Sequence, residues 1–409
     1  MTKNISGQPA DGGTGTEQKA ESNGGKTMEY RELGRTGLKA GVIGIGCEGF
    51  LGRREEDVIS ELQWLMDQGC NLFEMYTPDP AFHRAVGKAV RGRRDKVILQ
   101  AHIGSVWKNG EYLRTRDIEL IRKAFPERLE QLGTDYVDIG MIHFADSEKD
   151  WKEIYEGPVM EYVREMKKEG KIRHIGLSTH SATTAMQAAR TGEVEVILFS
   201  VNPCYDMISG ETEIDALMDG DTYKGGVQAQ NRERRDFYEY CERNGIAINI
   251  MKAYGGGDIL SEKLSPFGKP FTPVQCLHYA LTRPAAVSVC PGCKTREEWK
   301  TALSYSEASE EEKDYVPVLS AASSYTIEGH CMYCGHCAPC TKGIRIWDVT
   351  KYLNLALAEG MVPETVADHY RALEYHGSDC IQCGACESRC PFKVAIIRNM
   401  QKAEEIFGI

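Results

Sequence analysis

Residues 97–104 (VILQAHIG) and 136–144 (YVDIGMIHF) are two mainly apolar stretches of strand length that flank the segment 118–132 (IELIRKAFPERLEQL). In that segment apolar residues recur at spacings of three and four, which gives a helix a single apolar face; they are Ile118, Ile121, Phe125, Leu129 and Leu132. Strands that are apolar on both faces are typical of parallel sheets covered by helices. The stretch therefore predicts one strand–helix–strand unit of a parallel α/β fold.

The same alternation of strand and helix repeats along most of the chain. We expect eight strands, at residues 42–47, 71–76, 97–104, 136–144, 174–180, 196–203, 247–254 and 286–291. Eight such units in about 270 residues match the size of a TIM barrel. The predicted fold class is therefore α/β, a (β/α)8 TIM barrel, with its chemistry on the loops that follow the carboxyl ends of the strands.

Eight of the fifteen cysteines form two short arrays near the end of the chain: Cys331, Cys334, Cys337, Cys340 and Cys380, Cys383, Cys386, Cys390. The second array has the C-x2-C-x2-C-x3-C-P spacing of bacterial iron-sulfur proteins, in which the fourth cysteine binds the other cluster. This predicts one [4Fe-4S] cluster on Cys331, Cys334, Cys337 and Cys390, and a second on Cys380, Cys383, Cys386 and Cys340. A pair of zinc ribbons is the alternative, since two C-x2-C pairs also suit tetrahedral zinc.

Three regions follow from these patterns. Residues 1–27 have no aromatic residue and are almost all small or polar, so we expect a disordered tail. The barrel then spans residues 28–312, and a small α-rich ferredoxin-like domain with both clusters spans residues 313–409. Two helices, near residues 347–358 and 363–373, are expected to pack around the clusters and exclude water.

Composition excludes some classes of partner. The net charge of −11 is unfavourable for binding nucleic acid, because phosphate contacts need a basic surface. No apolar run approaches the roughly twenty residues of a membrane helix. We expect a cytoplasmic protein with neither a nucleic-acid nor a membrane partner.

One motif favours a different fold. Residues 44–49 (GIGCEG) match the G-x-G-x-x-G pattern of dinucleotide-binding Rossmann domains, and Glu74 ends the next strand, where a ribose-binding acid would stand. A Rossmann helix begins at the third glycine, however, whereas here residues 50–54 intervene. We therefore keep the Rossmann fold as the alternative to the barrel.

Several segments resemble the aldo/keto reductase family, and with the cysteine arrays they resemble its iron-sulfur branch, in which a ferredoxin-like domain follows the barrel. The segments are 30–38 (YRELGRTGL), 87–89 (GKA), 132–138 (LGTDYVD), 142–143 (IH), 169–173 (EGKIR), 175–178 (IGLS), 250–252 (IMK) and 291–292 (PG). The resemblance covers nearly all of the chain from Met28. It implies an oxidoreductase that acts on a small carbonyl-type substrate.

The resemblance also implies an Asp, Tyr, Lys and His tetrad, which this chain keeps only at His143. Glu74 replaces the aspartate, His102 the lysine and Asp79 the tyrosine, while Tyr76 shares a strand face with Glu74. We expect Glu74, Tyr76, His102 and His143 to converge at the barrel mouth, where a protonated His102 beside a carboxylate could act as an acid. Two alternatives are a Glu-His-His metal site and polar residues that only satisfy one another.

The resemblance further implies a pocket for NADPH. Three glycines, Gly255, Gly256 and Gly257, follow the seventh strand, and Lys294, Thr295 and Arg296 begin the eighth helix, where TIM barrels bind phosphate. Ser178, Asn202 and Tyr205 are candidates to contact the nicotinamide. Thr272 with Gln275 and Thr295 with Glu298 are expected to form helix capping boxes. A ferredoxin or flavodoxin is the candidate electron carrier.

Two features leave the function open. The segment from Cys204 to about Gln230 is long and acidic, and is either a lid or a flexible insertion. Seven cysteines lie outside the arrays. Cys47, Cys204 and Cys293 come at or just past strand ends, where a third cluster or a reactive thiol is the alternative to the simplest interpretation, buried small apolar residues. A barrel that has lost catalysis and acts as an electron carrier or sensor is the alternative function.

Overall fold

The computed structural model describes residues 28–207, 232–265, 267–319, 331, 335, 337–359, 362, 364–390 and 393–409. The predicted tail at residues 1–27 and most of the predicted lid lie outside the described residues. The strands are β1 Tyr30–Glu32, β2 Lys39–Gly41, β3 Ile45–Gly46, β4 Leu72–Met75, β5 Ile98–Ile103, β6 Ser105–Lys108, β7 Glu111–Arg114, β8 Val137–Ile142, β9 Ile172–Thr179, β10 Val196–Ser200, β11 Ala247–Met251 and β12 Ala286–Val289.

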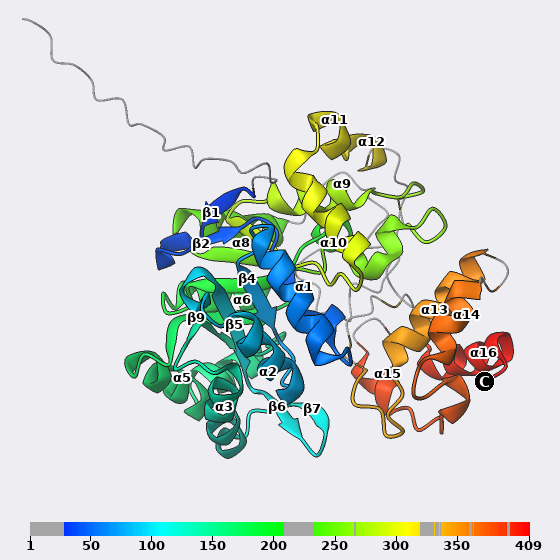
Figure 1. The fold of residues 1–409 in the computed structure, drawn as a ribbon, viewed down its shortest axis with the longest axis horizontal. Helices are drawn as coiled ribbons and strands as arrows, with labels where there is room; N and C mark the ends of the chain where they lie inside the picture. The colour runs from blue at the N-terminus through cyan, green and yellow to red at the C-terminus, as the bar shows by residue number, and fades with distance from the viewer. Residues whose placement is uncertain are drawn as a thin grey trace, which may run out of the picture.

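The α-helices alternate with these strands and continue beyond them (Figure 1). They are α1 Glu55–Asp67, α2 Pro80–Ala89, α3 Ile118–Leu132, α4 Glu148–Tyr155, α5 Pro158–Lys168, α6 Ala182–Arg190, α7 Pro203–Asp206, α8 Arg232–Arg243, α9 Pro273–Leu281, α10 Arg296–Leu303, α11 Glu310–Lys313, α12 Val316–Leu319, α13 Ile346–Glu359, α14 Glu364–Arg371, α15 Ala385–Arg389 and α16 Ile396–Phe407. None of the described helices is long and apolar enough to cross a bilayer.

The eight predicted strands form one curled parallel sheet in the order β12-β11-β10-β9-β8-β5-β4-β3. The segment just before β3 also meets β12, through a parallel bridge between Ile43 and Val289 in which Val289 N donates to Val42 O at 2.9 Å. The sheet therefore closes on itself, and the prediction of an α/β barrel is confirmed. Parallel strands in chain order place all carboxyl ends at one rim, where the predicted site residues lie.

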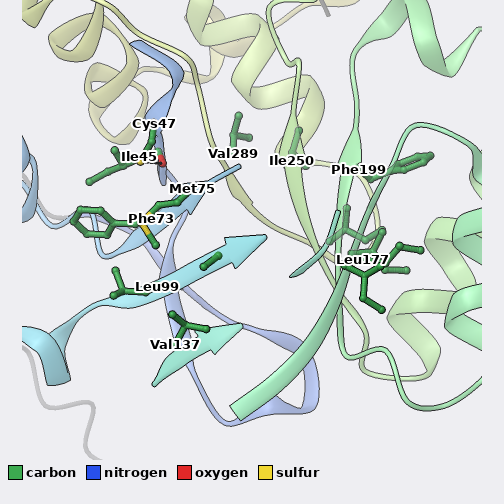
Figure 2. Packing of buried hydrophobic residues seen from close by; sticks show 14 of the residues in the cluster. Ile45, Cys47, Phe73, Met75, Leu99, Val137, Leu177, Phe199, Ile250 and Val289 are labelled. Atoms are coloured by element: carbon green, nitrogen blue, oxygen red, sulfur yellow. Dashed lines mark hydrogen bonds between the residues drawn. The ribbon is translucent and has the colours of Figure 1, made fainter. Parts of the chain in front are cut away.

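The strands are buried on both faces, as the sequence pattern predicted. On β5, Leu99, Ala101 and Ile103 belong to the large cluster that packs between the sheet and the helices. Figure 2 shows residues of this cluster, to which other strands contribute side chains such as Phe73 of β4 and Val289 of β12. The alternate residues of β5 face inward: the side chains of Gln100 and Asn249 on β11 form a 2.8 Å hydrogen bond across the interior. His102 shares the inward face with Gln100 because it lies two residues further along the strand.

Two glycines of the G-x-G-x-x-G motif serve barrel closure. A Cβ atom on Gly46 would lie 2.6 Å from the carbonyl oxygen of Pro291, and one on Gly49 would lie 2.0 Å from that of Cys293. Only glycine permits this approach between the first strand region and the loop after β12. The Rossmann alternative is therefore wrong, and the motif reflects packing of two backbone segments.

A second, smaller core lies beside the barrel, where helices α13 to α16 gather (orange to red in Figure 1). Its buried residues include Val349 and Leu353 of α13, Tyr370 of α14 and Met400 of α16. Helices α13 and α14 correspond to the two helices predicted in the spacer between the cysteine arrays. This separate core fits a distinct C-terminal unit, although the boundary at residue 313 stays a prediction.

Candidate active site at the barrel mouth

The carboxyl ends of β4, β5 and β8 are adjacent and hold three of the predicted residues. Glu74 on β4 is in register with Gln100 on β5, and His102 on β5 is in register with Met141 on β8. His143 comes directly after β8, and its backbone N–H donates to Ile103 O at 2.9 Å. The sheet thus brings Glu74, His102 and His143 to one point of the rim.

Their side chains form a row. His102 Nε2 lies 2.8 Å from Glu74 Oε1, and His102 Nδ1 lies 2.7 Å from His143 Nδ1. All three residues are at most 7% exposed. His102 Nδ1 therefore has a hydrogen-bond partner in His143, whereas His102 Nε2 and Glu74 Oε1 are close but do not have hydrogen-bonding geometry.

A fourth residue, Tyr112, extends the row and was missed by the sequence analysis. Its hydroxyl lies 2.6 Å from His143 Nε2. Tyr112 is on β7 of a hairpin, inserted between β5 and α3, that turns at Asn109 and Gly110, both with positive φ. An Asn-Gly pair between two short alternating stretches is a strong hairpin signal and would have indicated this insertion.

Arginines hold the hairpin against the loop after β8. Arg116 donates from Nη1 to His143 O at 2.8 Å, and Arg114 donates from Nε to Phe144 O at 3.1 Å. Asp150 at the start of α4 accepts from Arg116 Nε at 3.0 Å and also contacts Arg114. These contacts fix the position of Tyr112 relative to His143, because both attachment points flank that histidine.

The surroundings favour neutral forms of two of these groups. Burial lowers the pKa of His143 well below its usual value, and the neighbouring His102 and arginines 116, 114 and 128 lower it further. Burial raises the pKa of Tyr112 to about 12, although Arg114 and Arg116 oppose the shift. At neutral pH His143 is thus a neutral imidazole and Tyr112 a neutral phenol.

Tyr76 and Asp79 lie near the row but outside it. The ring of Tyr76 meets that of Tyr112 edge to face, with centroids 6.5 Å apart. Burial, and then Glu48 and Glu74, raise the pKa of Tyr76 well above its usual value. Asp79 caps α2, where its side chain accepts from Ala81 N at 2.8 Å. Asp79 therefore has a structural role at the place of the family's tyrosine.

The predicted phosphate pocket contains cations that already have partners within the chain. Arg296 donates from Nε and Nη2 to the two carboxylate oxygens of Glu61, each at 2.8 Å, and stacks over Trp64. Lys294 Nζ lies 3.7 Å from Asp348 Oδ1 on α13. Both cationic side chains are about two-fifths exposed, at 38% and 43%.

Binding of a nucleotide phosphate at this pocket stays a prediction. The carboxylate partners of the two cations are buried, with Glu61 6% and Asp348 3% exposed, so a phosphate at this place would have to share the cations with these acids. Gly256 and Gly257 have φ values of 77° and 104°, and a Cβ on Gly257 would meet nothing within 4 Å. Thr295 caps α10 and accepts from Glu298 N at 3.2 Å, but Glu298 accepts from Lys294 N and not from Thr295, so this capping box is only half formed.

The three candidate nicotinamide contacts differ in their surroundings. Ser178 is buried near the end of β9, at 4% exposure. Asn202 caps α7 by accepting from Tyr205 N at 3.0 Å, and its amide donates to Lys252 O at 3.0 Å. Tyr205 packs into the small C-terminal core with Ile344 and Ile346. Their role toward a cofactor stays a prediction.

The cysteine arrays meet at the small C-terminal core. Cys331, Cys337 and Cys340 from the first array and Cys380, Cys386 and Cys390 from the second all contact it. Arg389 of the second array donates to the carbonyl oxygens of Cys337 and Pro339 in the first, each at 2.7 Å. Gly335 and Gly384, one in each array, have φ values of 76° and 73°, which glycine adopts readily in a tight turn.

Backbone N–H groups already point at two of these sulfurs. Lys342 N donates to Cys340 Sγ and Gln382 N donates to Cys380 Sγ, each at 3.4 Å, as is common around cluster ligands. All four cysteines predicted for the second cluster are described, yet no three of them converge as cluster ligands would, so the pair of clusters stays a prediction. Among the described residues, which exclude Cys334, no three His, Cys, Asp or Glu side chains converge as metal ligands would. The Glu-His-His metal alternative at the barrel mouth therefore has no support.

The seven cysteines outside the arrays are all buried, as the simplest interpretation predicted. Burial raises the pKa of Cys47, Cys204 and Cys293, so these groups are protonated thiols at neutral pH. A buried thiol with a raised pKa is a poor nucleophile and metal ligand.

Comparison with known proteins agrees with this geometry. Residues 42–328 match the model of the aldo/keto reductase family, a match that ends three residues before Cys331. The chain is 30% identical over 200 residues to aldo-keto reductase YhdN of Bacillus subtilis, covering 46% of this chain and 57% of that relative, which is less than two thirds of its length. It is 25% identical over 311 residues to L-galactose dehydrogenase of Arabidopsis thaliana, covering 72% of this chain and 85% of that protein.

A solved structure shows the same fold. Aldo-keto reductase AKR11C1 from Bacillus halodurans, in its holo form, superposes with a TM-score of 0.57 at 19% identity, covering 74% of this chain and 99% of that one. The likeness supports the curled eight-stranded sheet and its helices. Because the family match spans well over half of the chain, this chain belongs to the aldo/keto reductase family.

Proposed function

We propose that this oxidoreductase interconverts a small carbonyl compound and its alcohol at the barrel mouth, and exchanges the electrons through two [4Fe-4S] clusters in its C-terminal unit. NADPH or a carrier protein such as ferredoxin or flavodoxin is the external redox partner. The observation that supports the proposal most directly is the buried row of Glu74, His102, His143 and Tyr112 at the strand ends. Acid–base groups in such a row suit a reaction in which a substrate oxygen gains or loses a proton.

Contacts between the C-terminal unit and the barrel support an electron path. Tyr205, which follows β10, packs in the same core as cysteines 337 and 386. Asp348 on α13 approaches Lys294 of the phosphate pocket, and Arg345 is close enough to Tyr76 to oppose the rise of its pKa. The cysteine unit therefore lies against the rim that holds the row, which is where electrons from its clusters are needed.

The chain offers candidate ligands for each proposed cofactor. Lys294, Thr295, Arg296 and the glycines 255–257 would hold the phosphates of NADPH, and the eight array cysteines would bind the clusters. The nucleotide supplies two electrons as a hydride, whereas clusters transfer electrons singly. The chain itself binds and orients the substrate, excludes water and moves the proton.

Titration of the anaerobically purified full-length protein with NADPH tests the proposal. Bleaching of the cluster absorbance is expected, because reduced clusters absorb less in the visible range. Re-oxidation by a carbonyl probe such as 4-nitrobenzaldehyde should restore the absorbance. Metal analysis is expected to give iron and inorganic sulfide; zinc in their place would contradict the cluster assignment.

A second function has one observation in its favour. Asp79, at the place of the family's tyrosine, is used as a helix cap, which suits a barrel that has lost catalysis and acts as an electron carrier or sensor. Bleaching by NADPH without recovery by any aldehyde or ketone in a panel would favour that function. Recovery by a carbonyl compound would exclude it.

A further inference from the structure

The four side chains at the barrel mouth form one continuous line of close contacts. From the buried end outward they are Glu74, His102, His143 and Tyr112, with successive polar atoms 2.8, 2.7 and 2.6 Å apart. The first three are at most 7% exposed, whereas Tyr112 is only partly buried. Tyr112 is therefore the member of the line that a substrate can reach most easily.

The position of each proton follows from the partners. Glu74 as a carboxylate can only accept, so we place the proton of His102 on Nε2, which lies 2.8 Å from Glu74 Oε1 and can donate to it after a rotation of the carboxylate. If His102 is neutral, its Nδ1 can only accept, and His143 must donate from Nδ1. His143 is neutral as well, so its Nε2 accepts from the hydroxyl of Tyr112. Every proton in the line then points toward Glu74.

We propose that Tyr112 is the catalytic residue that exchanges a proton with the substrate oxygen, and that His143 and His102 relay this proton to Glu74. The inference rests on the proposed function, because it names how that site handles the proton. The nitrogens of His143 are both engaged, so the imidazole reaches a substrate only through the phenol. The hairpin thus supplies the tyrosine that the strand position at Asp79 lacks.

The relay balances for oxidation of an alcohol. The substrate O–H bond breaks and its proton joins Tyr112 Oη, while the tyrosine's own proton moves to His143 Nε2. The Nδ1 proton of His143 moves to His102 Nδ1, and the Nε2 proton of His102 moves to Glu74 Oε1. The hydrogen on the substrate carbon leaves with its electron pair to the oxidised nicotinamide nucleotide, and the carbonyl forms. Reduction runs through the same steps in reverse.

The kinetic test compares two variants of the full-length, cluster-loaded protein. Tyr112→Phe keeps the ring but removes the hydroxyl, and Trp107→Phe changes the exposed residue directly across the hairpin. The probes are 4-nitrobenzyl alcohol with NADP+ and 4-nitrobenzaldehyde with NADPH. Tyr112→Phe should lower kcat roughly 100- to 10,000-fold in both directions with little change in KM. Trp107→Phe should stay within about threefold of the wild type, since it leaves the hydroxyl of Tyr112 in place.

Retention of kcat in Tyr112→Phe within threefold of the wild type, or an increase, would overturn the proposal. An increase would mean that the phenol merely occupies the place of the substrate oxygen beside His143. Loss of kcat together with an equal loss in Trp107→Phe would also overturn it, because the hairpin's packing would then be the cause.

A second measurement does not depend on turnover. Nitrogen-15 NMR of the histidines, of which the chain has ten, reports which ring nitrogen bears the proton. The proposal requires a proton on Nδ1 of His143 and on Nε2 of His102, and a shift of the Nε2 signal of His143 in Tyr112→Phe. The opposite tautomer at either histidine would refute the relay. If the wild type converts no carbonyl probe, the proposed function fails, while this spectrum still decides whether the relay exists.

Discussion

His102 and His143 face each other through their Nδ1 atoms at 2.7 Å, deep in the rim of the barrel. The contact explains why a histidine suits position 102, where the resemblance to the family had implied a lysine. An ammonium group has three donors and no acceptor, so it cannot receive a hydrogen bond from His143. An imidazole can accept from His143 on Nδ1 while its Nε2 lies 2.8 Å from Glu74 Oε1.

His102→Lys should therefore lower activity even though it restores the family's residue. The lysine can pair with Glu74 but leaves the Nδ1–H of buried His143 without an acceptor. We therefore expect the imidazole ring of His143 to flip. We expect kcat with the 4-nitrobenzaldehyde probe to fall roughly 100-fold or more, as for loss of a general acid–base group. His143→Ala is the comparison and should lose at least as much. Wild-type kcat in His102→Lys would show that position 102 needs only a donor.

Stability should fall in mild acid because of buried neutral histidines. His83 on α2 is 0% exposed, and burial lowers its pKa to about 3. In the unfolded chain the pKa of histidine is about 6.5, so below that pH the unfolded state binds a proton that the native state does not. Each pH unit below about 6.5 then costs about 1.4 kcal/mol for this group, and His143 contributes in the same direction.

The measurement is the urea midpoint between pH 7 and pH 5, in the wild type and in His83→Phe. The variant keeps a buried ring that cannot titrate, so its loss of stability with falling pH should be smaller by the contribution of one proton. Equal slopes in both proteins would mean that His83 is protonated in the folded state or already neutral in the unfolded one.

The sequence predicted the barrel because burial on both faces leaves a clear pattern. All eight expected strands overlap an observed strand, and the capping box at Thr272 and Gln275 is fully formed. The same pattern could not show the hairpin β1–β2, whose strands have three residues each. Leu33, between them, is nevertheless fully buried among residues of the barrel interior, such as Leu72.

The site was predicted only where its residues follow strand ends. Glu74, His102 and His143 meet because parallel register fixes their height in the sheet. Tyr112 comes from an insertion, and its contact with His143 depends on how Arg114 and Arg116 tie the hairpin to the loop after β8. The pairing of Lys294 with Asp348 joins residues that are far apart in the chain, and such a contact leaves no local pattern.

Asp206 should be essential for the stability of the loop after β10. The residue is 0% exposed; its Oδ1 accepts from Arg234 Nε at 2.8 Å and from Tyr238 Oη at 2.5 Å, and its Oδ2 accepts from Tyr279 Oη at 2.9 Å. Asp206→Ala removes the negative charge beside a buried guanidinium. Breaking one half of a buried ion pair costs about 3–5 kcal/mol, which should appear in the urea midpoint.

The double variant Asp206→Leu with Arg234→Met is the matched control. Replacing both charges by apolar groups of similar size is often neutral, so it should recover much of the lost stability. No recovery in the double variant would indicate that the hydrogen bonds of Tyr238 and Tyr279, and not the buried charge, determine the cost.

The last prediction concerns Cys390 and the crossed ligand sets. Cysteines of both arrays contact one small core, and Arg389 beside Cys390 donates to the carbonyl oxygens of Cys337 and Pro339. The second array is thereby held against the loop of the first. If Cys390 completes the cluster otherwise bound by cysteines 331, 334 and 337, Cys390→Ser should lower the iron content from about eight toward four atoms per chain.

The control is Cys70→Ala, which changes a buried barrel cysteine outside the arrays and should leave the iron content unchanged. Circular dichroism should show the barrel intact in both variants, because its core is separate from the one that holds the arrays. Full iron and an unchanged EPR spectrum of reduced Cys390→Ser would contradict the crossed pairing, whereas loss of all iron would mean that the two clusters assemble only together.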